Sequence, residues 1–201
     1  NAAEEKPAGN PAADVSDIRS VILVGEGNSF TAGLDLTSMI TMPSDDAART
    51  AIRATHTIRR MQRAFSAVAH CPVPVIAVVH GHCLGAGVDL ICACDVRIAS
   101  SCAEFNVKEV AMGIPADLGT LQRMPRLVNN QSVLREWIFT ARNFSAKEAF
   151  DNGFISSVEA DAKAARAKGL ALAQAIAQHS PVAVYATKVA LTVANVVADE
   201  Q

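Results

Sequence analysis

Three carboxylates stand within one stretch of the sequence, each beside apolar residues. Asp89 closes the glycine-rich turn Gly85-Ala86-Gly87-Val88-Asp89, and Glu109 and Asp117 follow it. The segment Val110–Pro115 between the last two carries no charge. Acidic groups beside apolar sequence cost free energy unless they are solvated, paired or used in a reaction. We therefore expect this chain to work by moving protons between the three groups.

Two turns that contain glycine could hold a negatively charged oxygen. They are Phe30-Thr31-Ala32-Gly33-Leu34-Asp35 and Gly85-Ala86-Gly87, and each is expected to join a strand to a helix. Small residues let a ligand approach the main chain, and the free N–H groups of a helix start favour negative charge. Together the turns could form an oxyanion hole, in which each N–H donor is worth about 2.7–4 kcal/mol of transition-state stabilisation. Neither turn has the glycine spacing of a dinucleotide fingerprint or a P-loop.

The elements that must position these groups alternate between strands and helices. Apolar runs predict strands at Ile18–Val24, Pro74–Val79, Asp95–Ser100, Glu104–Val107 and Phe154–Val158. Periodicity and cap residues predict helices at Leu34–Ile40, at Asp45–Ala69, from the Gly85 turn to Cys94, from Ala116 or Asp117 onward, at Asp161–Gln178 and from Pro181. Ser145 with Glu148 has the spacing of a capping box. This alternation favours an α/β arrangement with crossover connections.

Composition limits the class of protein. The chain has 201 residues, 50% of them hydrophobic, which predicts one domain with a substantial core. Its net charge of −2 gives no overall attraction to nucleic acid or to an anionic membrane, and no apolar stretch reaches the length of a membrane span. The five cysteines lack the spacing of a zinc site, so we expect small buried thiols and no metal. No targeting signal is visible, although a chain that starts at Asn1 could have lost one.

The long helix predicted at 45–69 has two distinct faces. One face is an apolar stripe whose members are spaced alternately by three and four residues. The other face carries a basic stripe formed by Arg49, Arg53, His56, Arg60 and Arg63. A solvated outer face is the simplest interpretation of the basic stripe, and a phosphate contact or an RNA-binding helix are the alternatives.

Ordered motifs along most of the chain give it a resemblance to a known family. They are Phe30-Thr31-Ala32-Gly33-Leu34-Asp35-Leu36, Pro74-Val75-Ile76-Ala77-Val78-Val79-His80-Gly81, Gly85-Ala86-Gly87-Val88-Asp89-Leu90, Cys94-Asp95-Val96-Arg97, Gly113-Ile114-Pro115, Ser145-Ala146-Lys147-Glu148-Ala149 and Gly153-Phe154-Ile155. On these motifs the chain resembles the crotonase (enoyl-CoA hydratase/isomerase) superfamily over about residues 18–192. The resemblance implies an α/β fold, the crotonase-type ββα superhelix, with a C-terminal helical region. Within a single domain at 1–201, residues 1–17 would be a flexible lead-in, about 18–158 the spiral core, and about 159–201 a helical part that we expect to be incomplete.

The resemblance also implies a ligand and a site. Members of the superfamily bind acyl-CoA thioesters, in which coenzyme A is part of the substrate and no further cofactor is needed. The backbone N–H groups of Ala32 and Ala86 would hold the thioester oxygen, although the family most often has Gly at the position of Ala86. The rest of the first turn would contribute to the oxyanion hole and to CoA binding: Gly33, Leu34, Asp35 and Leu36. Homotrimers or hexamers located in mitochondria or peroxisomes, with neither membrane nor nucleic acid as a partner, are the expectation.

The three acids favour one subfamily of this superfamily. Hydratases carry glutamates at the positions of Asp89 and Glu109 and a small residue at the position of Asp117. The sequence around Glu109 and Asp117 is instead similar to the Δ3,5-Δ2,4-dienoyl-CoA isomerases, whose reaction removes a proton from carbon 2 and adds one at carbon 6. We assign Glu109 to carbon 2 and Asp117 to carbon 6. Asp89, stabilised as an anion by the free N–H groups in the first turn of its helix, would tune the pocket.

Other interpretations stay open at this point. The chain could be a 2-enoyl-CoA hydratase that uses Asp89 and Glu109, or a crotonase-fold RNA-binding protein that uses the basic stripe. Asp117 could serve only as a helix N-cap, because Asp is favoured there. Asp95 and Arg97, which flank a predicted strand, could form a structural pair.

Overall fold

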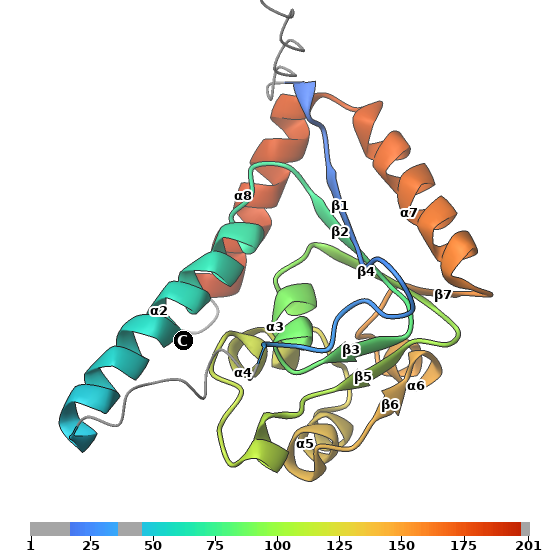
Figure 1. Cartoon of the computed structure of the whole chain (residues 1–201). Helices are drawn as coiled ribbons and strands as arrows, with labels where there is room; N and C mark the ends of the chain where they lie inside the picture. Colours follow the sequence, from blue (N-terminus) through green and yellow to red (C-terminus); the bar gives the residue numbers. More distant parts are fainter. Residues whose placement is uncertain (1–16, 36–45, 198–201) are drawn as a thin grey trace, which may run out of the picture.

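The computed structural model describes residues 17–35 and 46–197, and the strands of this part form two sheets (Figure 1). The four-stranded sheet is parallel, in the order β1 (Val21–Val24), β2 (Val75–Val79), β4 (Val96–Ser100) and β7 (Ser157–Glu159). The three-stranded sheet has the order β3 (His82–Leu84), β5 (Glu104–Asn106) and β6 (Phe144–Ser145). Strand β3 pairs with β5 in parallel, and β6 pairs with β5 antiparallel. Successive strands thus leave one sheet and enter the other, with β3 following β2 and β5 following β4.

Strands β2 and β4 form the centre of the larger sheet, and nearly all of their side chains are buried. All five residues of β2 are buried, as expected for a parallel strand that is covered on both sides. Helix α7 (Ala162–Ala177) covers the outer face, where Ile76, Val78 and Ile98 pack with Ala165 (Figure 1). The inner face belongs to the main core, in which the ring of Phe144 stacks on those of Trp137 and Phe105, and the ring of Phe154 meets those of Phe105 and Phe144 edge-on.

The remaining helices surround the inner face and the smaller sheet. They are α2 (Ala47–Ala69), α3 (Ala86–Cys92), the 3-10 helix η2 (Glu109–Met112), α4 (Thr120–Arg123), the 3-10 helix η3 (Met124–Arg126), α5 (Gln131–Thr140), α6 (Ala146–Asp151) and α8 (Pro181–Val197). The predicted capping box is present, since the Ser145 side chain accepts from the N–H of Glu148 and the Glu148 side chain accepts from the N–H of Ser145. Asp161 caps α7 in the same manner by accepting from the N–H of Ala164. Local sequence therefore sets these helix starts.

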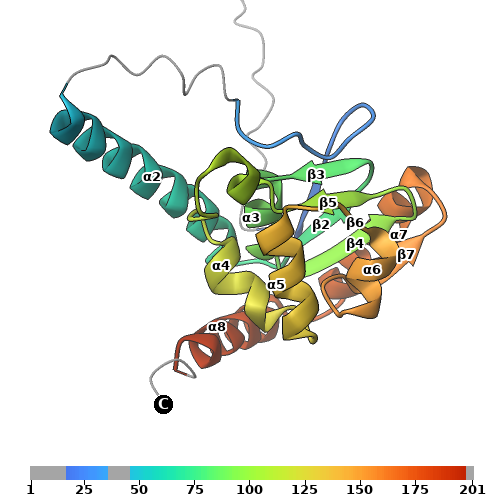
Figure 2. The same cartoon turned by 90° about the horizontal axis from the view of Figure 1, so that it is seen from below.

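Helix α2 projects from the body of the molecule along much of its length (Figure 2). Its cap is Asp46, which accepts from the N–H of Arg49, and none of its 23 residues is buried. The helix contacts α3, and its Gln62 and Ser66 side chains form hydrogen bonds with Asp117 and Arg123. In the described part of the chain, no helix has the length and apolar character needed to cross a membrane.

Several predicted boundaries differ from the structure. Strand β1 begins at Val21 instead of Ile18, β7 begins at Ser157 instead of Phe154, and α4 begins at Thr120 instead of near Asp117. Strands β3 and β6 were not predicted, because segments of two or three residues become strands only through pairing with β5. The predicted lead-in lies almost wholly outside the described residues, as does most of the helix expected at 34–40.

Candidate active site

The two glycine-containing turns lie against each other. Thr31 pairs with Cys83 as a parallel bridge, and the Thr31 N–H donates to the carbonyl oxygen of His82 over 2.9 Å. In return, the Leu84 N–H donates to the Thr31 carbonyl over 3.2 Å. A Cβ atom added to Gly33 would lie 2.9 Å from the Leu84 oxygen and 3.8 Å from the Ala86 nitrogen. The structure therefore brings the Ala32-Gly33 turn next to the turn that begins α3.

Glycine permits both of these turns. Gly33 has a φ of 97° and Gly85 a φ of 52°, and residues other than glycine rarely adopt such values. The Gly85 N–H donates to the carbonyl of Asn106 over 2.9 Å, which fixes the second turn to the end of β5. Ala86 is the first residue of α3, so its own N–H has no acceptor inside that helix. Leu34 and Asp35 continue the first turn, and Leu36 lies outside the described residues.

Glu109 places its carboxylate over the second turn. A Cβ atom on Gly85 would lie 3.4 Å from Oε1 of Glu109. The side chain is half-buried, and its Oε2 atom is buried with no hydrogen-bond partner among the described residues. Burial raises the pKa of the Glu109 carboxyl above its ordinary value, and the negative charges of Asp89 and Asp117 raise it further, against a hydrogen bond from its own backbone. Such a group is a stronger proton acceptor than an exposed glutamate.

Asp89 is fully buried behind the same turn. Its Oδ1 atom accepts from the backbone N–H of Thr120 over 2.6 Å, and its Oδ2 atom is a second buried carboxylate oxygen without a partner in the described part of the chain. Burial raises the pKa of Asp89, opposed by the hydrogen bonding from Thr120. The prediction that N–H groups of its own helix stabilise Asp89 as an anion is wrong in two respects. The donor belongs to the start of α4, and desolvation outweighs it.

Asp117 lies between Pro115 and the start of α4. Its carbonyl oxygen accepts from Nε2 of Gln62 over 2.7 Å. The N-cap of α4 is Gly119, so the interpretation of Asp117 as a simple helix cap is wrong. Its negative charge raises the pKa of both Asp89 and Glu109, which places the three carboxylates within one electrostatic neighbourhood.

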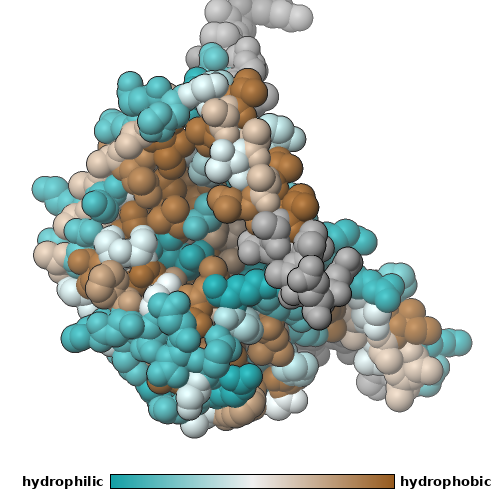
Figure 3. All heavy atoms as spheres, turned by 180° about the vertical axis from the view of Figure 1, so that it is seen from behind, coloured by the Kyte–Doolittle hydropathy of each residue, from teal (hydrophilic) through white to brown (hydrophobic). Residues whose placement is uncertain are grey.

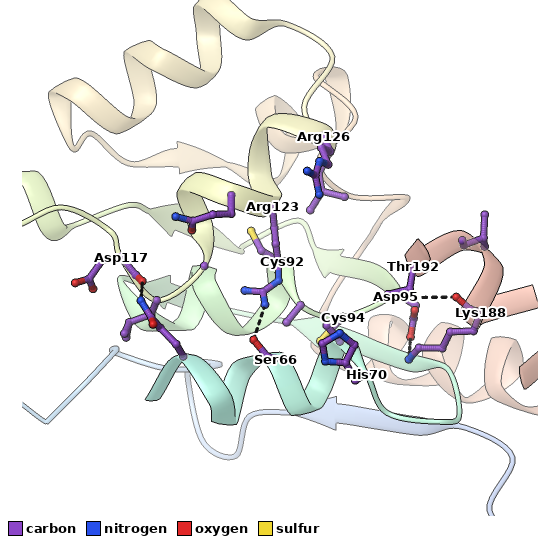
Figure 4. Close-up of a pocket in the computed structure, with 18 residues that line it drawn as sticks. Ser66, His70, Cys92, Cys94, Asp95, Asp117, Arg123, Arg126, Lys188 and Thr192 are labelled. Atoms are coloured by element: carbon purple, nitrogen blue, oxygen red, sulfur yellow. Dashed lines mark hydrogen bonds and ion pairs between the residues drawn. The ribbon is translucent and has the colours of Figure 1, made fainter. Parts of the chain in front are cut away.

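A cavity of about 720 Å³ extends from Asp117 (Figure 4). Residues from α2, the end of α3, α4 and α8 line it, and Asp117 lies at one end while Asp95 and Lys188 lie at the other. The wall includes apolar side chains such as Leu118, Leu127 and Leu191. The cavity is large enough for an extended hydrocarbon chain. Figure 3 shows hydrophobic residues gathered around a hollow on the rear face of the molecule.

The other residues that the sequence analysis named lie in contacts within the fold or on its surface. Asp95 pairs with Lys188 over 2.7 Å, and Arg97 donates instead to the carbonyls of Cys94 and Phe154, so the predicted Asp95–Arg97 pair is wrong. Three of the five cysteines are buried, whereas Cys71 is half-buried and Cys102 is exposed. Within residues 17–35 and 46–197, no cluster of three or more histidine, cysteine or acidic side chains could hold a metal ion.

The basic stripe of α2 lies on exposed surface. Arg49, His56, Arg60 and Arg63 are exposed, and Arg49 forms an ion pair with Asp46 over 3.3 Å. This exposure agrees with a solvated outer face, while a role in RNA binding stays a prediction.

Sequence reasoning missed two residues that hold the acid-bearing segment. Gln62 reaches the backbone of Asp117 from α2, and Thr120 supplies the N–H that Asp89 accepts. A signal for Gln62 was present, because Gln62 and Ser66 are polar residues four apart beside an apolar stripe, and both line the cavity.

Comparisons with known proteins agree with this geometry. Residues 10–199 match the family model of enoyl-CoA hydratase/isomerase. The human mitochondrial Δ3,5-Δ2,4-dienoyl-CoA isomerase is 47% identical over 88% of this chain and 55% of its own length. The peroxisomal Δ3,5-Δ2,4-dienoyl-CoA isomerase of Arabidopsis thaliana is 40% identical over 92% of this chain and 68% of its own length. The crystal structure of a protein from Thermobifida fusca YX, in complex with acetoacetyl-CoA, superposes on this structure with a TM-score of 0.75. The two chains are 33% identical, and the match covers 86% of this chain and 69% of that one.

Proposed function

Because the chain belongs to the enoyl-CoA hydratase/isomerase family, we propose that the protein converts 3,5-dienoyl-CoA thioesters into their 2,4-isomers. The crotonase-type α/β fold follows from the same membership. The chain spans about half the length of the human relative, so the activity is proposed for the whole protein that contains it. The observation that carries the proposal is the third acid, Asp117, which lies near Asp89 and Glu109 and at the end of the cavity.

The order of groups along the site fits the order of atoms in the substrate. The thioester oxygen would accept from the N–H groups of Ala32 and Ala86, where developing negative charge is stabilised. Glu109 lies over the Gly85 turn, beside the proposed position of the thioester, where it would face carbon 2. Asp117 lies at the end of the cavity, where it would face carbon 6. The rest of the acyl chain would enter the cavity.

The reaction then needs two proton transfers. Glu109 takes a proton from carbon 2, and the electron pair of that bond moves into the thioester to form an extended trienolate. Asp117 gives its proton to carbon 6, the double bonds move to carbons 2 and 4, and the thioester carbonyl is restored. Transfer of the proton from Glu109 back to Asp117 returns both groups to their starting states. Each positioned acid–base group typically contributes a factor of 10²–10⁴. The raised pKa of Glu109 suits the first step, because it makes the carboxylate a better base.

The test is an isomerase assay that follows the ultraviolet absorbance of the conjugated 2,4-product. We expect Asp117→Asn and Glu109→Gln each to lower kcat by about a hundredfold or more, because each removes one proton carrier. Acyl-CoA binding should remain, since neither substitution touches the oxyanion-hole backbone. The exposed Asp151→Asn change on α6 is the matched control. Full isomerase activity in Asp117→Asn would contradict the proposed roles.

A 2-enoyl-CoA hydratase is the second candidate, favoured by the proximity of Asp89 and Glu109, whose charges interact. Two carboxyl groups that flank one water molecule could add it across a double bond. Against this candidate, Asp89 is fully buried and engaged by Thr120, which leaves it poorly placed to hold a water. Hydration of crotonyl-CoA faster than isomerisation of a dienoyl-CoA would favour the hydratase.

The proposal extends to assembly and location. Five large apolar side chains of α8 are more than 40% exposed: Val182, Tyr185, Val189, Leu191 and Val193. Exposed apolar surface of this kind marks an interaction site, and a homotrimer or hexamer would cover it. Sedimentation velocity of the full protein tests the assembly. The names of the two relatives place them in mitochondria and peroxisomes, so one of these organelles is the proposed location.

A further inference from the structure

The segment that carries Asp117 has little regular structure of its own. Residues 113–119 belong to no helix or strand, and α4, which follows them, is only four residues long. Residues 113–115 are exposed. A carboxylate on such a segment needs outside contacts to keep a fixed position, because an error of about 1 Å in a reacting group can cost 10²-fold in rate.

Two side chains from distant elements hold the main chain of this segment. Nε2 of Gln62 donates to the Asp117 carbonyl over 2.7 Å, and Oδ1 of Asp89 accepts from the Thr120 N–H over 2.6 Å. Gln62 comes from α2 and Asp89 from α3, so the anchors reach the segment from two different helices. Both contacts end on backbone atoms at or near residue 117.

Helix α2 makes a second contact one turn after Gln62. Nη2 of Arg123 donates to the Ser66 hydroxyl over 3.1 Å, and the Arg123 guanidinium lies across Gly119, where a Cβ would collide with it. Gln62 and Ser66 are four residues apart and therefore share one face of α2. This face therefore contacts the segment at Asp117 and, through Arg123 of α4, beside Gly119 (Figure 4).

We propose that Gln62 and Asp89 are positioning residues that fix Asp117 opposite carbon 6 of the substrate. The inference rests on the proposed function. It assigns a role to Gln62, and it changes the role of Asp89 from tuning the charge of the pocket to accepting one backbone hydrogen bond. Asp89 need not gain or lose a proton during the reaction, because its contact is to an amide.

Carbon 2 and carbon 6 can be followed separately. In deuterium oxide, Glu109 would exchange deuterium into carbon 2 of 3,5-dienoyl-CoA, whereas formation of the 2,4-product requires Asp117. Loss of an anchor should therefore slow product formation and leave exchange at carbon 2 running. A general loss of folding would slow both.

The experiment compares four variants of the full protein. Gln62→Met removes the donor at nearly constant volume, and Asp89→Ala removes the acceptor. We expect both to lower kcat for product formation by about tenfold to a hundredfold, with KM and exchange at carbon 2 little changed. Asp89→Asn retains a carbonyl oxygen as acceptor and should keep most of its kcat. Gln174→Met, at an exposed glutamine of α7, is the control.

Two results would overturn the positioning roles. One is an equal fall of exchange and product formation in Gln62→Met at unchanged melting temperature. The other is a loss in Asp89→Asn as large as in Asp89→Ala, which would show that the carboxylate itself takes part. A wild-type protein that neither exchanges carbon 2 nor forms the 2,4-isomer would instead refute the proposed function, and the positioning roles with it.

Discussion

Asp89, Glu109 and Asp117 share one site but differ in what surrounds each carboxylate. Asp89 is fully buried and holds a backbone amide, Glu109 is half-buried over the Gly85 turn, and Asp117 lies at the end of the cavity. The charge of Asp89 acts on Glu109, so a change at Asp89 should appear in the titration of Glu109.

The pH dependence of the reaction tests this coupling. In the proposed reaction Glu109 acts as a base only when ionised, and its pKa is raised above the ordinary value of 4.5, so kcat/KM should fall as the pH drops through a value above 4.5. The charge of Asp89 is one cause of that raised pKa. In Asp89→Asn, the acid limb of kcat/KM should therefore move to lower pH. Asp151→Asn should leave the limb in place, and an unmoved limb in Asp89→Asn would contradict the coupling.

At the scale of elements, the site depends on how closely α3 approaches the first turn. A Cβ on Gly87 would collide with Cγ2 of Thr31 and lie 3.3 Å from Sγ of Cys83. Gly87→Ala should therefore push the Ala32 and Ala86 turns apart and misalign the two N–H groups proposed to hold the thioester oxygen. Loss of one oxyanion donor costs about 10²–10³ in kcat, so we expect up to that loss in the isomerase assay.

A second substitution separates this cause from other effects of Gly87→Ala. Thr31→Ser removes the Cγ2 atom and keeps the hydroxyl, whose oxygen accepts from the Gly33 N–H over 3.2 Å. The double variant should recover most of the lost kcat, whereas Thr31→Ser alone should stay close to wild type. No recovery would mean that the approach of α3 to the turn is not what sets the rate.

Sequence patterns predicted the elements whose signals are local. Buried apolar runs located β2 and β4, and the Asp161 and Ser145 caps marked where α7 and α6 begin. Strands β3 and β6 could not be found in this way, because partners distant in the chain define them.

The residues of the candidate site also divide into those with a local sequence signal and those defined by distant contacts. The carboxylates and the two turns were visible from residue types and the family motifs. The contact of Gln62 with Asp117 joins residues 55 apart, and that of Thr120 with Asp89 joins residues 31 apart. Only the tertiary structure brings such pairs together, and only burial reverses the direction expected for the pKa of Asp89.

At the scale of the whole molecule, one buried arginine joins separate parts of the chain. Nε of Arg97 donates to the carbonyl of Phe154 over 2.7 Å and Nη1 donates to that of Cys94 over 2.8 Å. The Arg97 backbone carbonyl in turn accepts from Ser156. Strand β4 is thereby tied both to the end of α3 and to the segment before β7.

Removal of this guanidinium should destabilise the fold. Arg97→Met would leave the two carbonyls without their donor, and unsatisfied buried groups cost about 1–3 kcal/mol each. We expect the free energy of unfolding to fall by about 2–5 kcal/mol, measured as a lower urea midpoint. Arg135→Met, at an exposed arginine that bonds within its own helix, is the control and should change the midpoint little. Equal midpoints for the two variants would contradict this role.

The contacts of Gln62 and Asp89 have a consequence for how such enzymes diverge. Both contacts hold main-chain atoms, so neither depends on which side chain residue 117 carries. A relative could exchange that one side chain for a small one and keep the path of the backbone, the cavity and the oxyanion turns. The framework would then accept a different reaction after a single substitution, and its stability would change little. Residue 117 thus acts as an interchangeable part in a scaffold that other residues keep in place.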